Sequence, residues 1–240
     1  MCISIQITRG PTASAILSAV SEGNARHLRP VDPQRMIVFN CSQAFAEFIE
    51  PRKAGPAPLV CEAPSPHPSE DGPHLIDVDG EPARYVQQWL VHFVRIQRQP
   101  CAVAMDIETR YAMVFPHLKK GDPEGFINVF ATRLMNEMVR SADGVEMIAD
   151  FEAMLARFVE INERFLFVRR AERSTQSHLK EAVWDFEHDC HANGCVPETH
   201  EDCAVIDARI NQMLRSTKAL RDYFIPEEEM LCAWLRTYGG

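Results

Sequence analysis

The sequence predicts an α+β protein: a small α/β region over residues 1–120, then a predominantly α-helical bundle over residues 121–240 that zinc braces. Three observations carry this prediction. The first half alternates short apolar runs with helix signals, and the second half repeats apolar residues at helical spacing. In addition, six of the sixteen residues over 188–203 are cysteine or histidine.

Composition places the chain among ordinary globular proteins. Its 240 residues are 46% hydrophobic and 25% charged, and a chain of this length buries a substantial core. No apolar run approaches the roughly 18 residues of a membrane-spanning helix. The N-terminus also lacks the pattern of a secretory signal. We therefore expect a cytoplasmic protein without a membrane partner, whose eight cysteines are thiols or metal ligands.

The net charge of −9 comes entirely from the second half. Residues 1–120 carry 12 acidic and 12 basic side chains, whereas residues 121–240 carry 22 and 13. An acidic surface excludes broad, sequence-independent nucleic-acid binding, because phosphate contacts need a basic surface. Nucleic acid then remains a partner only through a local basic patch or within a larger complex.

The N-terminal region is predicted to alternate strands and helices. Residues 3–7 alternate in polarity as a half-buried strand does, and a helix is expected after Pro11. Met36–Phe39 suits a second strand. Ser42 is then expected to cap a short helix whose apolar residues are Phe45, Phe48 and Ile49.

A proline-rich segment follows over residues 51–73, with seven prolines in 23 residues. Proline lacks the N–H group that helices and sheets need, so we expect an insertion or linker. Leu59, Val60 and Cys61 are its candidates for contact with the body of the protein.

A core helix is predicted to begin at Asp79, because apolar residues recur at helical spacing over residues 85–96. Cys101–Phe115 is ambiguous. Val103, Met105 and Ile107 alternate as in a strand that a hairpin partner would follow, but a short helix also fits.

The second half reads as a series of helices. Apolar stripes predict five of them, beginning near residues 122, 145, 174, 202 and 226. The second stripe runs to Phe165 and the fourth to Leu220.

The Cys/His cluster at 188–203 predicts a structural zinc site between the third and fourth helices. Zinc accepts thiolate sulfur and imidazole nitrogen in a tetrahedral shell. The best four ligands lie at the end of the third helix, in the connection, and at the start of the fourth helix. They are Cys190, Cys195, His200 and Cys203. His188 and His191 compete for a place in the shell. Unmetallated thiols and surface histidines are the alternative.

Two further groups are candidates for chemistry or binding. The basic cluster comprises Arg164, Arg169, Arg170 and Arg173, which form either a solvated helix end or a local binding patch. The other group is acidic: Asp106 and Glu108 lie two residues apart on a predicted strand, where paired carboxylates hold divalent cations.

The segment Met105–Thr109 resembles the first acidic motif of the DnaQ-type (DEDD) exonucleases. The resemblance covers about five residues and implies metal-dependent phosphodiester chemistry. The family also requires two further aspartates. Here Asp150 and Asp185, the latter with His178, stand in at a longer spacing than the family's pattern.

The functional prediction is a zinc-stabilised binding or adaptor protein. Its helical surface would contact a protein partner, alone or within a nucleoprotein complex. A phosphodiesterase or exonuclease-like enzyme that uses Asp106 and Glu108, with Asp185 as a further candidate, is the alternative.

Overall fold

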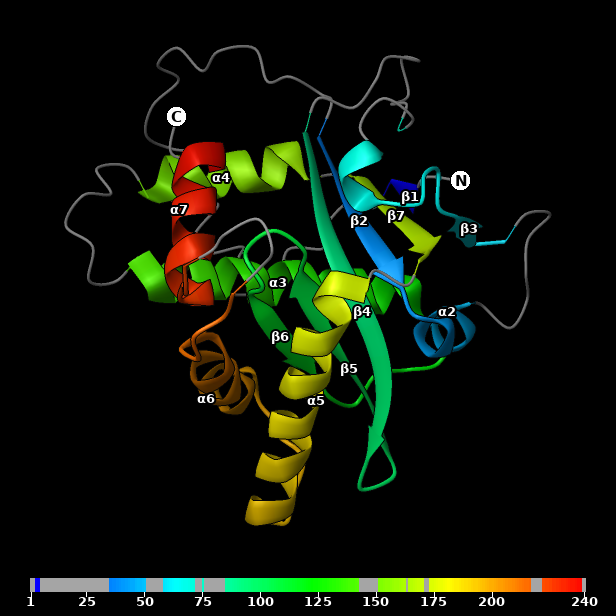
Figure 1. Cartoon of the computed structure of the whole chain (residues 1–240), viewed down its shortest axis with the longest axis vertical. Helices are drawn as coiled ribbons and strands as arrows, with labels where there is room; N and C mark the ends of the chain where they lie inside the picture. The colour runs from blue at the N-terminus through cyan, green and yellow to red at the C-terminus, as the bar shows by residue number, and fades with distance from the viewer. Residues whose placement is uncertain are drawn as a thin grey trace.

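A seven-stranded mixed sheet lies at the centre of the molecule, with helices on both of its faces (Figure 1). The computed structural model describes residues 3–4, 35–50, 58–71, 75, 85–142, 151–162, 164–170, 173–216 and 222–238. The predicted helix after Pro11 and the predicted helix start at Asp79 lie outside these residues.

The strand order places β2 at the centre of the parallel part of the sheet. In spatial order the strands are β1 (Ile3–Ser4), β7 (Arg164–Arg169), β2 (Arg35–Cys41), β4 (Tyr85–Ile96), β5 (Gln99–Asp106) and β6 (Ala112–Phe115). A short strand, β3 (Val60–Glu62), also pairs with β7. Because β2 runs parallel to both β7 and β4, their carboxyl ends point toward the same edge. From β4 through β6 the sheet is antiparallel.

The predicted core helix over residues 85–96 is wrong, because this segment forms the twelve-residue strand β4. The strand lies between β2 and β5 and buries side chains on both faces. Trp89 and Val91 enter one core, whereas Leu90 enters the other. A strand buried on both sides has few polar interruptions, so its apolar positions also match a helical stripe.

The β5–β6 hairpin resolves the ambiguity over Cys101–Phe115 in favour of strands. A tight turn also joins β4 to β5, where Gln97 and Arg98 have positive φ angles of 48° and 70°. Left-handed conformations at both central residues suit a two-residue hairpin, whose twist matches that of the flanking strands.

The chain returns to the sheet at β7, which contradicts the helix predicted to run through Phe165. Helix α4 (Phe151–Ile161) ends before it. Since β7 lies between β1 and β2, the sheet crosses the predicted domain boundary at residue 120. A separate C-terminal helical bundle is therefore not confirmed; the helices instead pack on the sheet.

One face of the sheet carries the larger core. Helices α3 (Pro123–Ala142), α4 and α7 (Pro226–Tyr238) cover it, together with the short helix α2 (Gln43–Ile49). As predicted, Ser42 caps α2 by accepting a hydrogen bond from the backbone N–H of Phe45. The ring of Phe130 meets those of Phe39 and Trp89 edge-on, each at a centroid distance of 4.9 Å. Such edge-to-face contacts stabilise the core beyond simple burial.

Helices α5 (Arg173–Asn193) and α6 (His200–Asn211) cover the opposite face, the one toward the viewer in Figure 1. The predicted fourth helix ends earlier than expected. After Asn211 the chain turns, and the backbones of Arg215 and Phe224 exchange two hydrogen bonds of 2.8 and 2.9 Å. None of the described helices is both long and apolar enough to cross a membrane.

Helix α6 also covers the outer edge of strand β6. The side-chain amide of Asn211 accepts from the backbone N–H of Ala112 and donates to its carbonyl, both at 2.7 Å. One turn earlier, the carboxylate of Asp207 accepts from the N–H of Val114 at 2.8 Å. The guanidinium of Arg133 donates to the Val114 carbonyl and pairs with Asp207. These side chains take the place of a further strand, so the edge is closed to another chain.

The proline-rich segment contributes to the sheet. Its strand β3 extends the sheet beside β7, and the carboxylate of Glu50 accepts from the N–H groups of Leu59 and Val60 at 2.9 and 3.2 Å. The predicted contact of this segment with the body of the protein is confirmed over residues 59–61.

Candidate functional site

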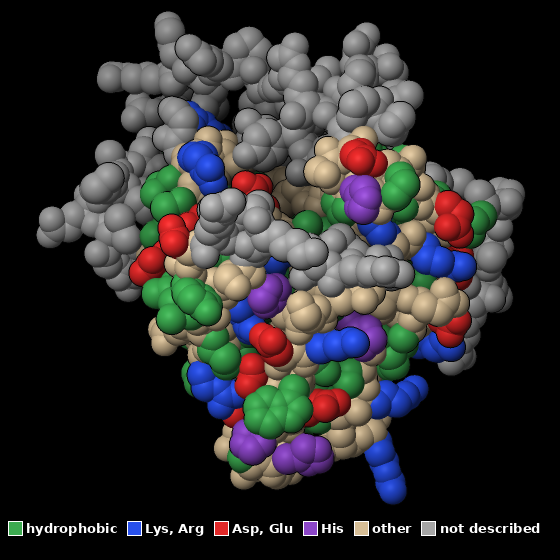
Figure 2. Space-filling model, viewed as in Figure 1, with side chains coloured by type: hydrophobic (Ala, Val, Ile, Leu, Met, Phe, Trp, Pro, Cys, Tyr) green, Lys and Arg blue, Asp and Glu red, His purple; other side chains and the backbone are tan. Residues whose placement is uncertain are grey.

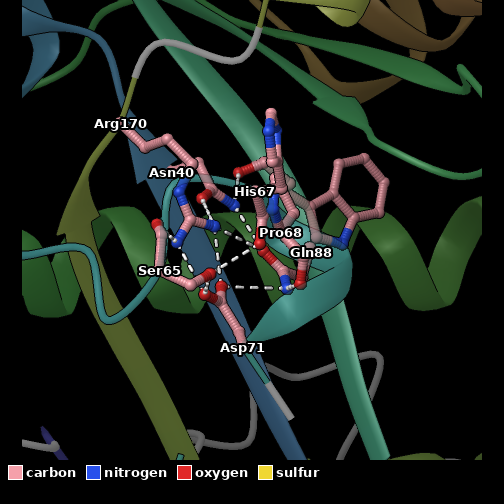
Figure 3. A network of polar contacts seen from close by, with 8 residues as sticks. Asn40, Ser65, His67, Pro68, Asp71, Gln88 and Arg170 are labelled. Atoms are coloured by element: carbon pink, nitrogen blue, oxygen red, sulfur yellow. Dashed lines mark hydrogen bonds and ion pairs between the residues drawn. The ribbon is translucent and has the colours of Figure 1, made fainter. Parts of the chain in front are cut away.

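Arg170 forms the centre of a buried polar network at the carboxyl end of β7 (Figure 3). Its guanidinium donates two hydrogen bonds of 2.6 Å to the carboxylate of Asp71, one to each oxygen. It also donates to the side chain of Asn40 at 3.0 Å and to the carbonyl of Ser65 at 2.8 Å. Arg170 and Asp71 are almost fully buried, so this is a charge-assisted pair away from solvent.

The same carboxylate binds the proline-rich segment to strand β4. It accepts from the hydroxyl of Ser65 at 2.6 Å and from the amide of Gln88 at 3.1 Å. The Gln88 amide also donates to the carbonyl of Pro68 at 2.6 Å. We call the side chains of Asn40, Ser65, Asp71, Gln88 and Arg170 the Arg170 clasp. It attaches the 65–71 segment to strands β2, β4 and β7.

The structure separates the four arginines that were predicted as one basic cluster. Arg164 and Arg169 belong to strand β7, not to a helix end. Arg169 is exposed, and its Nη1 atom lies 3.9 Å from Oε1 of Glu62. Arg170, in contrast, is buried and forms an ion pair with Asp71 in the clasp. Arg173 begins α5. The predicted solvated helix end is therefore wrong at residues 164–170, because these residues form the end of a strand.

The Asp106 carboxylate is part of the β5–β6 turn. One of its oxygens accepts from the N–H groups of Glu108 and Thr109, at 3.1 and 2.8 Å, and from the Thr109 hydroxyl at 2.9 Å. Asp106 is buried, whereas Glu108 is exposed. Within the described ranges, no three His, Cys, Asp or Glu side chains gather as a metal-binding group. Asp185 lies on α5, and Asp150 falls outside these ranges.

The pKa of Asp106 predicts an unusual pH dependence. Burial raises this pKa from 3.8 to about 6, although the hydrogen bonds from Thr109 act against the shift. A raised carboxyl pKa means that the folded protein holds the proton more tightly than the unfolded chain. The contribution of Asp106 to stability is therefore lost as pH rises from about 4 to about 6.

We expect Asp106→Asn to stabilise the protein above about pH 7, by about 1–3 kcal/mol, and to change little near pH 4. The asparagine oxygen retains the three turn hydrogen bonds from Glu108 and Thr109. Urea unfolding of both proteins from pH 4 to 8 measures the difference. A stability difference that does not grow with pH would contradict this account.

The predicted zinc ligands lie around the α5–α6 connection but are unequally placed. Cys190 and Cys203 are buried, and the pKa of each thiol is raised by burial, to about 12 and about 11. Cys195 and His200 are exposed, as are the competing residues His188 and His191. All six belong to the part of the chain that the structure describes, and they do not converge as a metal-binding group.

The outer face of α5 exposes a tryptophan. Trp184 is 63% exposed, and its ring stacks on that of His188 at a centroid distance of 5.3 Å. The other two tryptophans, Trp89 and Trp234, are buried. Figure 2 shows two histidine side chains beside a hydrophobic group near the lower end of α5, with acidic side chains close by. An exposed aromatic ring of this kind is typical of the centre of a binding interface.

Trp184 is one of several exposed large hydrophobic side chains, and it lies in a strongly acidic segment of the chain. Large exposed hydrophobic side chains in the described ranges are Val139 on α3 and four between α5 and α7: Trp184, Val205, Leu214 and Tyr223. Residues 180–216 carry eight acidic side chains and three lysines or arginines, a net charge of −5. Two of these arginines pair locally, Arg209 with Asp189 and Arg215 with Glu181. We call the exposed side of α5 and α6 around Trp184 the Trp184 face.

Sequence reasoning missed both the Arg170 clasp and the Trp184 face. Asp71 lies in a proline-rich stretch that suggests no buried ion pair, and its partner is 99 residues away. The exposure of Trp184, in contrast, follows from the sequence pattern of its helix. Trp184 falls outside the stripe of Leu179, Val183, Phe186 and Cys190, so a helical projection places it on the solvent side.

Comparisons with known proteins give a family but no activity. No curated protein matches the chain, and neither does any solved structure. Residues 39–229 match the model of a family described as "Domain of unknown function (DUF6933)". The matched range runs from β2 to the start of α7 and contains the Arg170 clasp and the Trp184 face. The chain therefore belongs to this DUF6933 family.

Proposed function

We propose that this protein is a cytoplasmic binding or adaptor protein that uses the Trp184 face to bind a basic segment of a protein partner. The observation that carries the proposal is the 63% exposure of Trp184 within a segment, residues 180–216, of net charge −5. Indole rings bind ammonium and guanidinium groups through cation–π contacts, and the neighbouring carboxylates add charge attraction.

The geometry favours one kind of partner. Trp184 and His188 are one helical turn apart and stack, so together they present a continuous flat surface. Val205 on α6 and Tyr223 before α7 are also exposed hydrophobic side chains, at 72% and 74% exposure. A partner with lysines or arginines spaced between apolar residues matches both the charge and the hydrophobic character.

Trp184→Ala is expected to weaken this binding by about 2 kcal/mol or more without lowering the melting temperature, because the side chain makes little contact with the core. The probes are oligolysine peptides with interspersed leucines. They are added stepwise to the protein, and binding is measured as the change in Trp184 fluorescence. The variant Trp184→Ala is followed by calorimetry instead. Raising the salt to about 0.5 M is expected to weaken binding strongly.

Two matched controls sharpen the experiment. Val139→Ala removes an exposed hydrophobic side chain from α3 and is expected to leave the affinity unchanged. Oligoglutamate peptides of equal length test the sign of the charge. Equal affinity for both peptides, or equal affinity of wild type and Trp184→Ala, would show that the Trp184 face is not the binding surface.

Structural zinc at Cys190, Cys195, His200 and Cys203 stays a prediction. Cys190 and Cys203 belong to the same buried cluster, whereas Cys195 and His200 are exposed. Because Cys190 belongs to α5 and Cys203 to α6, zinc there would stabilise the packing of these two helices rather than act in catalysis.

A further inference from the structure

A serine and a histidine lie in contact at the junction of β2 and α2. The Oγ atom of Ser42 is 3.0 Å from Nδ1 of His92, which belongs to the middle of strand β4. Both side chains are partly exposed. The backbone N–H of Ser42 also donates to the carbonyl of Val91 at 2.9 Å, which fixes the serine beside the strand that carries the histidine.

The position of this pair in the sheet is one that enzymes use. Ser42 directly follows the carboxyl end of β2, and β2 has parallel neighbours on both sides. In α/β sheets, ligands and reacting groups collect at the carboxyl ends of parallel strands.

The environment of His92 suits a general base. Partial burial lowers its pKa below the ordinary value of 6.5, so the imidazole is neutral at neutral pH and has a ring nitrogen free to take up a proton. Two charged residues of α5 act on it in opposite directions. Lys180 lowers the pKa of His92, and Glu187 raises it by stabilising the imidazolium. A serine hydroxyl within hydrogen-bond distance of a neutral imidazole is the arrangement of a nucleophile with its general base.

The role of Ser42 as N-cap of α2 does not explain why its hydroxyl also contacts His92. As N-cap, Ser42 uses a lone pair of Oγ to accept from the N–H of Phe45 at 3.3 Å. Its hydroxyl proton is not needed for that role and is free to be donated to Nδ1 of His92 in the tautomer that carries its proton on Nε2. We therefore propose that Ser42 and His92 form a nucleophile–base pair that hydrolyses carboxylic esters, independently of the Trp184 face.

The reaction balances as ester plus water giving acid plus alcohol. Ser42 Oγ bonds to the ester carbonyl carbon while its proton moves to His92 Nδ1. The bond to the alkoxy group then breaks, and the departing oxygen takes that proton. In the second half, water attacks the acyl-serine and gives a proton to His92. The bond from the acyl carbon to Oγ breaks, and the proton returns to Ser42.

A fluorophosphonate probe tests this proposal on the whole protein. We expect the probe to attach to Ser42, located by mass spectrometry of the peptide that contains it. Ser42→Asn is the matched variant, because asparagine also caps helices but has no hydroxyl. It is expected to melt at the wild-type temperature and to take up no probe at this position.

Two further measurements separate catalysis from accidental labelling. His92→Gln is expected to slow labelling of Ser42 about 100-fold or more. Hydrolysis of para-nitrophenyl acetate is expected to rise with pH to a plateau, with its midpoint below 6.5, the ordinary pKa of histidine. Absence of the probe from Ser42 in the wild-type protein, or a wild-type labelling rate in His92→Gln, would overturn the proposal. If His92→Gln does not fold, a labelling rate that rises only above about pH 8 would overturn it equally.

Discussion

Asp71→Ala is expected to lower the free energy of unfolding by about 3–5 kcal/mol. The alanine leaves the guanidinium of Arg170 buried without its carboxylate, and only the oxygens of Asn40, Ser65 and Gln88 remain as acceptors. A buried charge without its partner is among the most costly of single changes. Urea unfolding, with tryptophan fluorescence and circular dichroism as probes, measures the loss.

Neighbouring residues supply the controls for this result. Arg169→Met removes an adjacent arginine whose ion pair with Glu62 is exposed, and we expect a loss of less than about 1 kcal/mol. The double variant Asp71→Leu with Arg170→Met replaces the pair by apolar groups and is expected to be more stable than Asp71→Ala alone. A loss as small for Asp71→Ala as for Arg169→Met would show that the clasp is not buried.

Asp207→Ala is expected to have a comparable effect, about 3–5 kcal/mol, and to promote self-association. It leaves the Arg133 guanidinium without its carboxylate and the Val114 N–H without an acceptor. Loss of α6 from the edge of β6 then exposes unpaired backbone groups, to which another copy of the strand can bind. Denaturation measures the first effect, and light scattering as a function of concentration measures the second.

Asp202→Ala is the matched control on the same helix. Asp202 belongs to the exposed capping box with Thr199, so its removal should cost much less stability than Asp207→Ala and leave the protein monodisperse. Asn211→Leu separates the two effects of Asp207→Ala, because it opens the edge at Ala112 without leaving a buried charge. If Asp207→Ala and Asp202→Ala lose equal stability, the edge contact does not hold α6 in place.

Much of the secondary structure could be predicted where local signals agreed. Ser42 is a helix-capping residue and predicts the start of α2. Asp122–Pro123 and Pro226 predict the starts of α3 and α7 in the same way. Strand β2 and the β5–β6 hairpin also follow from short apolar runs and alternation. In each case the residues that determine the element lie within it or directly beside it.

The errors concern segments whose structure depends on distant partners. Strand β4 is covered on both faces of the sheet by helices, and it pairs with β5. Strand β7 pairs with β1 on one side and with β2 on the other. Its six residues, Arg164–Arg169, carry two charges at their ends and an apolar centre, which also fits a helix end. The sequence contains no sign of the pairing partner, so periodicity alone could not distinguish the two.

The candidate sites also differ in whether their contacts are local in the sequence or join distant segments. The ambiguity of Asp106 is local, since a carboxylate at a strand end serves a hairpin turn as well as a metal. The Arg170 clasp joins side chains of four separate segments, and the contact between Ser42 and His92 spans 50 residues. Pairings of this kind depend on strand register, which the sequence does not display.

The pairing of β2 with β7 has a consequence for the order in which the chain folds during synthesis. Ile37 pairs with Phe165, so the central strand lacks one neighbour until the ribosome has released about 130 further residues. Until then, the unpaired side of β2 has only intermolecular partners or a chaperone to bind. Nascent chains stalled before Arg164 should therefore be captured by chaperones, and those stalled well beyond Arg169 should be released from them.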